Sequence, residues 1–552
     1  MSLSCYYALE VGTASVDFLS GIGSFVVSGG GEFFGECPNS VSIADPSHPV
    51  MAGITAAGLS DWICSMHEWF TSFPAGYAVL ATETGRPYII ATGSPPELLD
   101  PAPQLLTGPN VTTDPDLLED QGVKVDGIAA DGVARVVIRM PASMANEPFQ
   151  ITVLDDNMNP SGSTDDNGGV TAVGVDRSNL QNSVMVNAVS TPTKGPMVFA
   201  VYHAPVDFAR PGGSDDGSRL RLLTVRLESL DPSGRTELRM IEIRRPPVAL
   251  IHGIWSEPAT WDHFQPLLSD PRFDLCRIGY AATAGGSFAQ NAQNTLLRFR
   301  KCVDDFKQTF KAAAVQVDVV AHSMGGNITR TLPRVSNFLN NGNYNQGMVH
   351  KLITVDTPHG GSPFANALLA SNAACQAGFQ LLNKPVGGGA IQDLSTGSGA
   401  LALLATQIPA HVIIGEANVS QKNMAYSNAQ LALMGGLMGA GLDTLCPSVF
   451  PCPTGCPPSP FDTLLGSPFH DLIVPVWSQA GASGPTSPPS PPSSSFSNII
   501  HTVDRWLFTE GPDCLSRKII NGTIVGVSTG IPDRVIHLLN QRVIDPNWFR
   551  TF

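Results

Sequence analysis

A serine placed between a short apolar run and a helical stretch is the feature that most constrains the fold of this chain. The run reads VDVVAHSMGGN at positions 317–327. The apolar residues before the serine predict a buried strand, and the small residues Ala321 and Gly325 allow a strand and a helix to approach closely at a sharp turn. This is the G-x-S-x-G nucleophile-elbow pattern with alanine at its first position, so we predict Ser323 as a nucleophile whose hydroxyl stands clear of the sheet, on a strand–turn–helix unit.

The bulk composition limits the classes of partner. A chain of 552 residues with 43% hydrophobic residues predicts two or three domains with sizeable cores. A formal net charge of -15 argues against nucleic acid, which calls for a basic face. No run approaches the ~20 apolar residues of a transmembrane helix. The first residues, MSLSC, show no basic n-region or apolar h-region, so no signal peptide is visible.

The cysteines indicate an oxidising compartment. Ten cysteines accompany only 14% charged residues, which favours a secreted, cell-surface or periplasmic location. Cys446, Cys452 and Cys456 cluster among prolines, and no fourth ligand lies at zinc-like spacing, so a disulfide with one partner elsewhere is favoured over a metal site. Cys276 and Cys302 are candidates for another disulfide.

The first half of the chain divides into two parts. Residues 1–104 form a segment of uncertain fold. Residues 105–245 contain short alternating strands separated by turn residues, which predict a β-sandwich. The stretch VDGIAADG at 125–132 resembles the opening of bacterial immunoglobulin-like repeats. The loop 155–167 is rich in Asp and Asn and could hold Ca²⁺, but Pro160 stands where an EF-hand needs glycine, so a solvated acidic loop is favoured.

The second half, residues 246–552, follows a different pattern. After the boundary Pro246-Pro247, buried apolar strands alternate with longer helical stretches, which predicts a parallel sheet covered by helices. The expected strands are 248–251, 275–280, 317–320, 352–355 and 411–414. An insertion at about 421–469 would form a cap or lid, and the Gly, Pro and Ser-rich segment 481–495 is expected to be a flexible excursion.

Three motifs in the second half carry a family resemblance. They are His252-Gly253-Ile254 after the first strand, the serine elbow, and LITVDTPHGGS at 352–362. Together they resemble the bacterial lipase and esterase branch of the α/β-hydrolase superfamily, over roughly residues 246–545. The resemblance implies an oxyanion hole formed by the backbone N–H groups of Ile254 and Met324.

The same family requires an acid and a base after the serine, in that order. The segment HDLIVPV at 470–476 resembles the family's Asp-x-x-Val segment, which makes Asp471 the expected acid. Glu416, directly after a strand, is the alternative, whereas Asp356 is expected to be structural. The segment NIIHTV at 498–503 makes His501 the expected base, with His537 as the alternative in a predicted closing helix.

The implied activity is hydrolysis of a carboxylic ester through a Ser323–Asp471–His501 triad and an acyl-enzyme, with no metal or organic cofactor. If the insertion at about 421–469 is a lid, its apolar residues favour a lipid or other hydrophobic ester as substrate. The alternative that the insertion is a buried helical excursion with no gating role is equally open. Trp255 and Trp261 could line an acyl groove or belong to the core. A polyester depolymerase or acyltransferase with the same triad, and an adhesion protein with a non-catalytic hydrolase fold, are the alternatives.

Overall fold

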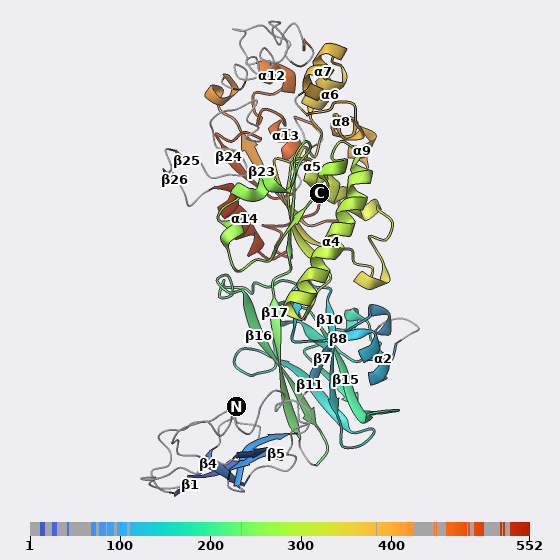
Figure 1. Cartoon of the computed structure of the whole chain (residues 1–552), viewed down its shortest axis with the longest axis vertical. Helices are drawn as coiled ribbons and strands as arrows, with labels where there is room; N and C mark the ends of the chain where they lie inside the picture. The colour runs from blue at the N-terminus through green and yellow to red at the C-terminus, as the bar shows by residue number, and fades with distance from the viewer. Residues whose placement is uncertain are drawn as a thin grey trace.

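The computed structural model describes residues 96–106, 111–232, 235–381, 383–423, 460–482, 491–501 and 530–552, with short strands and single residues between and before them. Along the long axis of the molecule, Figure 1 shows short N-terminal strands at one end, paired β-sheets in the middle and an α/β part at the other end. The N-terminal strands form two three-stranded sheets. Their strands are β1 (Gly12–Val16), β2 (Phe25–Gly29), β3 (Val41–Ile43), β4 (Glu68–Ser72), β5 (Tyr77–Glu83) and β6 (Arg86–Thr92).

Two six-stranded sheets follow. The first contains β7 (Glu97–Pro101), β8 (Gly122–Val125), β10 (Arg135–Pro141), β12 (Gly169–Thr171), β14 (Val189–Thr191) and β15 (Gly195–His203). The second contains β9 (Gly127–Ala129), β11 (Pro148–Leu154), β13 (Ser183–Asn187), β16 (Leu220–Ser229), β17 (Thr236–Arg244) and β20 (Ala312–Ala313). These two sheets, called the paired sheets below, begin at Glu97. This start lies before the expected domain boundary at 105. Two short helices, α2 (Pro115–Asp120) and α3 (Thr164–Asn167), lie in the connections.

Alternation of apolar side chains creates the core between these two sheets. In β16, Leu223, Val225 and Leu227 are buried while the residues between them are more exposed. They share one apolar cluster with Val136 and Val198 of the first sheet. Two sheets with inward-facing alternate residues form one layered core. Membership of the immunoglobulin-like class stays a prediction.

The acidic loop of this region is held by ion pairs within the protein. Asp156 binds Arg210 at 2.8 Å, and Asp166 binds Arg542 at 2.7 Å. Asp155 Oδ1 accepts the backbone N–H groups of residues 157 and 159 and closes its own turn. These contacts give the carboxylates at 155, 156 and 166 partners within the protein.

The C-terminal part is built on a six-stranded parallel sheet, in the order β19–β18–β21–β22–β23–β24. Its strands are β18 (Val248–Ile251), β19 (Leu275–Ile278), β21 (Val317–His322), β22 (Val349–Val355), β23 (Ala410–Glu416) and β24 (Ser493–Ser497). Five of these strands confirm the expected ones. The sixth lies partly in the segment 481–495, so the expectation of a flexible excursion was wrong for residues 493–495.

Helices cover both faces of this sheet (Figure 1). Ala249 and Ile251 of β18 belong to the core beneath α4, whereas Val248 and Leu250 belong to the core beneath α14. Burial of alternate residues on opposite faces is typical of parallel sheets in α/β proteins. The described helices are α4 (Phe288–Phe310), α5 (Met324–Thr331), α6 (Pro363–Leu369), α7 (Ala373–Leu381), α8 (Gly389–Leu394), α9 (Gly399–Ala402), α12 (Pro460–Leu465), α13 (Val476–Gln479) and α14 (Ile531–Leu539).

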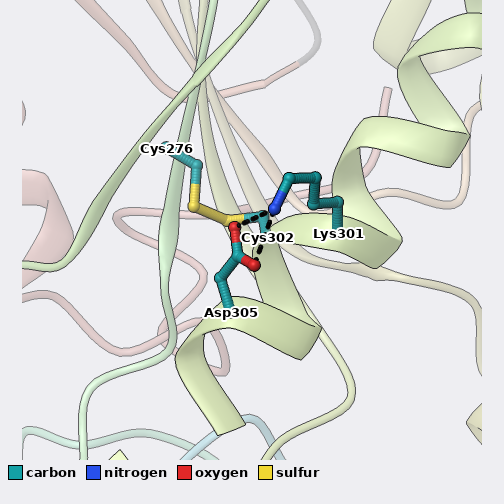
Figure 2. Close-up of a disulfide and its surroundings, with 4 residues drawn as sticks. All are labelled: Cys276, Lys301, Cys302 and Asp305. Carbon is teal, nitrogen blue, oxygen red and sulfur yellow. Dashed lines mark hydrogen bonds and ion pairs between the residues drawn. A yellow bond between two sulfur atoms is a disulfide. The ribbon is translucent and has the colours of Figure 1, made fainter. Parts of the chain in front are cut away.

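Two disulfides brace the helices of this part. Cys276 of β19 joins Cys302 of α4, as predicted, and Figure 2 shows this bridge beside the Lys301–Asp305 ion pair on the same helix. Cys446 joins Cys375 of α7, a partner far from the proline-rich cluster. Cys452, Cys456 and most of the insertion at 421–469 lie outside the described residues. Among the described helices, none combines the length and apolar character needed to cross a bilayer.

The paired sheets and the parallel sheet are joined at several points. β17 leads directly into β18 through Pro246-Pro247, and β20, which follows α4, returns to pair with β9. Asp131 Oδ2 accepts the backbone N–H groups of Val315 and Gln316, just before β21. The start of the strand that carries Ser323 is therefore fixed to the paired sheets.

A buried histidine lies at the same junction. His350 Nδ1 contacts Asp318 Oδ1 at 2.7 Å, and Nε2 contacts the carbonyl of Val206 at 2.9 Å. Both ring nitrogens face acceptors, so the doubly protonated ring satisfies both. Burial alone lowers the pKa of His350, but the charges of Asp318 and Asp207 outweigh burial and the nearby Lys351, and the pKa is raised.

We expect the stabilisation from His350 to depend on pH. A pKa raised in the folded state gives stability that is fully present below the unfolded value of about 6.5 and is lost as the pH rises through the folded value. The melting temperature of His350→Gln should therefore lie below that of wild type at pH 5.5–6, by roughly 2–4 °C for each kcal/mol of unfolding free energy that is lost. The difference between the two melting temperatures should narrow by pH 9. Thermal unfolding of both proteins over this range measures it. A gap that stays constant across the range would contradict the charged histidine.

Candidate active site

The elbow places Ser323 at the carboxyl end of β21, immediately before α5. Its backbone has φ +53° and ψ −130°, the strained conformation expected of a nucleophile elbow. The Ser323 N–H donates to the carbonyl of Val355, and Thr357 Oγ1 donates to the carbonyl of Ser323, both at 2.9 Å. A side chain at Gly325 would lie 2.8 Å from the carbonyls of residues 251 and 252. The small residues of the motif are thus required by the packing around the turn.

A hydrogen-bonded chain connects this serine to a histidine and a carboxylate. His501 Nε2 lies 2.8 Å from Ser323 Oγ, and His501 Nδ1 lies 2.7 Å from Asp471 Oδ2. With Nδ1 donating to the carboxylate, Nε2 is the ring nitrogen that can accept the serine proton. All three side chains are buried. The three predicted residues come together because the carboxyl ends of parallel strands meet at one edge of the sheet.

The carboxylate is fixed by its own turn and by a glutamine. Asp471 Oδ1 accepts the backbone N–H groups of Ile473 and Val474, at 3.0 and 2.7 Å. Gln479 donates from Nε2 to Asp471 Oδ2 at 3.1 Å and also bridges both backbone groups of Gly415. Gln479 was not predicted, because no motif in the sequence marks a glutamine on the short helix α13 as a partner of Asp471.

The surroundings favour the charged form of His501. Its burial alone would lower its pKa, but the charge and hydrogen bond of Asp471, with a further contribution from Asp356, raise the pKa above 6.5. His322, whose ring centroid lies 4.9 Å away, stays neutral because burial holds its pKa well below the usual range. His322 Nε2 donates to the carbonyl of His501 at 3.1 Å and so orients the histidine loop.

The alternative residues take other positions. Glu416 ends β23, and its backbone carbonyl accepts the N–H of Ile499, while Asp471 is the carboxylate on the histidine. His537 lies in α14 with its ring against Trp548. Trp261 is fully buried and packs edge-on against Phe264, so it belongs to the core.

The loop after β18 lies directly against the serine. A side chain on Gly253 would come within 2.7 Å of Ser323 Cβ, so a glycine is needed for this approach. The ring of Tyr280 stacks on His252 with centroids 4.1 Å apart, and its hydroxyl donates to the His252 carbonyl. Ile254 follows Gly253, and Met324 follows the serine, which are the positions of the predicted oxyanion donors. That role stays a prediction.

The next residue of this loop, Trp255, forms hydrogen bonds with the segment after α7. Its backbone has φ +53°, and its indole N–H donates to the carbonyl of Pro385 at 3.2 Å. Lys384 Nζ donates to the Trp255 carbonyl at 3.4 Å. The ring lies against Phe379 of α7. The half-buried Trp255 is therefore the tryptophan that could line an acyl groove.

Among the described residues, one group of potential metal ligands lies close enough together to hold an ion. It consists of Asp356, Asp471 and His501, whose ligand atoms lie within 4.8 Å of one another. Asp471 and His501 already hydrogen-bond to each other at 2.7 Å. An ion at this position would have to break that hydrogen bond, so the donor set fits an acid–base pair better than a metal centre.

The strand order, the serine elbow and a family match define an α/β-hydrolase-like fold. The model of the PGAP1-like alpha/beta domain matches residues 282–394, which include the elbow. The chain is similar to the mature form of the Bacillus licheniformis lipase BlEst2, with 14% identity, 46% of this chain and 84% of that chain covered, and a TM-score of 0.28. It is also similar to Staphylococcus hyicus lipase, with 13% identity, 46% and 87% covered, and a TM-score of 0.27.

A third similar structure is the phospholipase PlaB from Legionella pneumophila, with 15% identity, 32% of this chain and 40% of that chain covered, and a TM-score of 0.24. No curated protein matches the chain.

We expect Gly253→Ala to damage the site with little effect elsewhere. The added methyl group would collide with Ser323 and displace the loop that precedes Ile254. Loss of one correctly placed oxyanion donor lowers kcat by about 100-fold or more. Ester hydrolysis and melting temperature measure the effect, with Gly399→Ala as control, because a Cβ there meets nothing within 4 Å. Normal rates in Gly253→Ala would contradict the close approach of the loop.

Proposed function

We propose that this protein is a serine hydrolase that cleaves carboxylic esters. The observation that carries the proposal is the continuous hydrogen-bonded chain from Ser323 through His501 to Asp471, at 2.8 and 2.7 Å. Its order along the sequence, Ser, Asp, His, is the order of the α/β-hydrolases. The close approach of Gly253 to Ser323 supports the second half of an acyl-transfer site, the oxyanion hole that includes Ile254.

The mechanism follows from these positions. His501 Nε2 takes the proton of Ser323 Oγ as this oxygen attacks the ester carbonyl, and Asp471 stabilises the imidazolium that forms. The N–H groups of Ile254 and Met324 stabilise the negative charge on the carbonyl oxygen. His501 then gives its proton to the leaving alcohol. Water, activated by the same histidine, releases the acid from the acyl-enzyme.

A hydrophobic ester is the substrate class that the surroundings favour. Trp255, half-buried against the core residue Phe379, presents aromatic surface next to the oxyanion loop. Leu381 at the end of α7, Val419 after β23 and Phe469 before Asp471 are 69%, 71% and 57% exposed. Exposed apolar side chains form a surface for apolar ligands or lipid where they lie together in one patch. The two disulfides support a location in an oxidising compartment, at the cell surface or outside the cell.

The alternative functions differ from ester hydrolysis in the substrate or the acceptor of the acyl group, or in whether an acyl-enzyme forms at all. An acyltransferase or a polyester depolymerase would use the same three residues with another acceptor or a polymeric ester. An adhesion protein with a non-catalytic hydrolase fold would not react at Ser323. The hydrogen bond from Ser323 to a histidine with a raised pKa disfavours this last alternative.

We expect wild type to hydrolyse p-nitrophenyl esters and Ser323→Ala to lose the activity. Removing the nucleophile of such a site costs on the order of 10⁶ in kcat. Release of p-nitrophenol from C2 to C16 esters measures this, and the chain-length optimum separates an esterase from a lipase. A wild type inactive on every chain length, with Ser323 still labelled by a fluorophosphonate, would direct attention to another acyl bond.

The acid is tested by Asp471→Asn, with Glu416→Gln as the matched control on the neighbouring strand end. An amide in place of Asp471 leaves the histidine without its charged partner and favours the wrong tautomer, so kcat should fall by about 10⁴. Glu416→Gln should stay near wild type. Steady-state kinetics of both variants decide the assignment, and the reverse pattern would make Glu416 the acid.

A further inference from the structure

A second carboxylate lies beside the histidine. Asp356 directly follows β22, the strand next to the one that leads to Ser323. The backbone N–H of Asp356 donates to the carbonyl of Ile413 at 3.0 Å. Its side chain is fully buried and its φ is +50°. A positive φ is uncommon for a residue other than glycine, and such conformations cluster at functional sites.

Distances place this carboxylate within the charge field of the site. One Asp356 oxygen, one Asp471 oxygen and one ring nitrogen of His501 all lie within 4.8 Å of one another. Two carboxylates therefore lie close to the same imidazole, and Asp471 is hydrogen-bonded to it. At such separations in a buried site, a charge acts far more strongly than it would in water.

The backbone of the adjacent strand keeps this space open. A Cβ on Gly415 of β23 would lie 2.8 and 2.9 Å from the two carboxylate oxygens of Asp356. The same Cβ would lie 2.9 Å from the side chain of Ile499, two residues before His501. Only glycine allows the carboxylate and the histidine loop to share this side of the sheet.

The other ionisable groups near His501 do not cancel the influence of the Asp356 charge on the imidazole. Asp471 is negative and hydrogen-bonded, and His322 is held neutral by burial. Glu416, at the end of β23, is partly exposed. The field at the imidazole is thus dominated by two buried carboxylates when the ring is protonated.

We propose that Asp356 is a positioning residue that acts through His501, by stabilising the imidazolium formed when Ser323 gives up its proton. The inference rests on the proposed function. The proton moves from Ser323 Oγ to His501 Nε2 and later to the leaving group, and Asp356 neither takes nor gives it. Asp471 fixes the tautomer through its hydrogen bond, whereas Asp356 adds negative charge. A carboxylate that served the turn after β22 alone would affect folding without affecting this ionisation.

The test compares Asp356→Asn with wild type. The amide keeps the size of the side chain and removes its charge. We expect the pH midpoint of fluorophosphonate labelling at Ser323, which reports deprotonation of His501, to fall by about half a unit to one unit. The plateau of kcat/KM should fall by about three- to tenfold, because a unit of pKa shift corresponds to a tenfold change in the ionisation equilibrium.

Two controls separate this effect from a loss of folding. Asp318→Asn removes another buried carboxylate of the same sheet, which binds His350 at the opposite end of β21, and Glu416→Gln removes the carboxylate at the end of the next strand. Both should leave the labelling midpoint unchanged. If Asp356→Asn does not fold, Asp356→Ser is used with the same readout.

The outcomes are distinct. A wild-type midpoint in folded Asp356→Asn, with only a lower melting temperature, would overturn the inference and make the residue structural. Labelling requires no ester turnover, so a shifted midpoint in a protein that hydrolyses no ester would support the role of Asp356 while the proposed function failed. A wild type that neither hydrolyses esters nor becomes labelled would overturn both.

Discussion

The buried hydrogen bond between His501 Nδ1 and Asp471 Oδ2 is the interaction on which the candidate site depends. It joins two segments that follow different strands of the parallel sheet, and it orients the ring so that the other nitrogen faces Ser323. Burying a charge is costly unless it is paired and hydrogen-bonded. Asp471 meets this condition through its turn N–H groups and Gln479, so the carboxylate is stable in the interior before any substrate binds.

Strained backbone is concentrated around this hydrogen bond. Positive φ values occur at Trp255, Ser323, Asp356 and Leu472, which belong to four different segments at the carboxyl edge of the sheet. Each is a residue other than glycine, and a bulky side chain at positive φ costs free energy that the surrounding packing must offset. The contacts that offset it are specific: Pro385 and Lys384 bind Trp255, and Thr357 binds the carbonyl of Ser323. Pre-organisation of the site is thus distributed over its supporting residues.

The sequence predicted the parts of the site that depend on local pattern. The strand before Ser323 and the turn after it follow from apolar and small residues, and Asp471 and His501 follow from motifs of the resembled family. β24 could not be predicted, because its sequence, SSSFS, has no apolar alternation and forms a strand only through pairing with β23. Gln479 and Asp356 depend on contacts between segments far apart in the chain. Asp356 carried a signal, a carboxylate directly after a buried strand, but its approach to His501 is set by the adjacent Gly415.

The paired sheets bind the start of β21, the strand that leads to Ser323. Asp318, at the start of β21, binds His350, whose second nitrogen binds the carbonyl of Val206, and Asp131 holds the backbone just before β21. Ser323 lies at the far end of this strand, with all six of its residues buried. A buried strand fixed at its start cannot slide against its neighbours without breaking charged contacts at the junction, and its register with β18 and β22 sets the height of the serine. The paired sheets therefore support the strand that leads to Ser323, through the buried contacts of the junction.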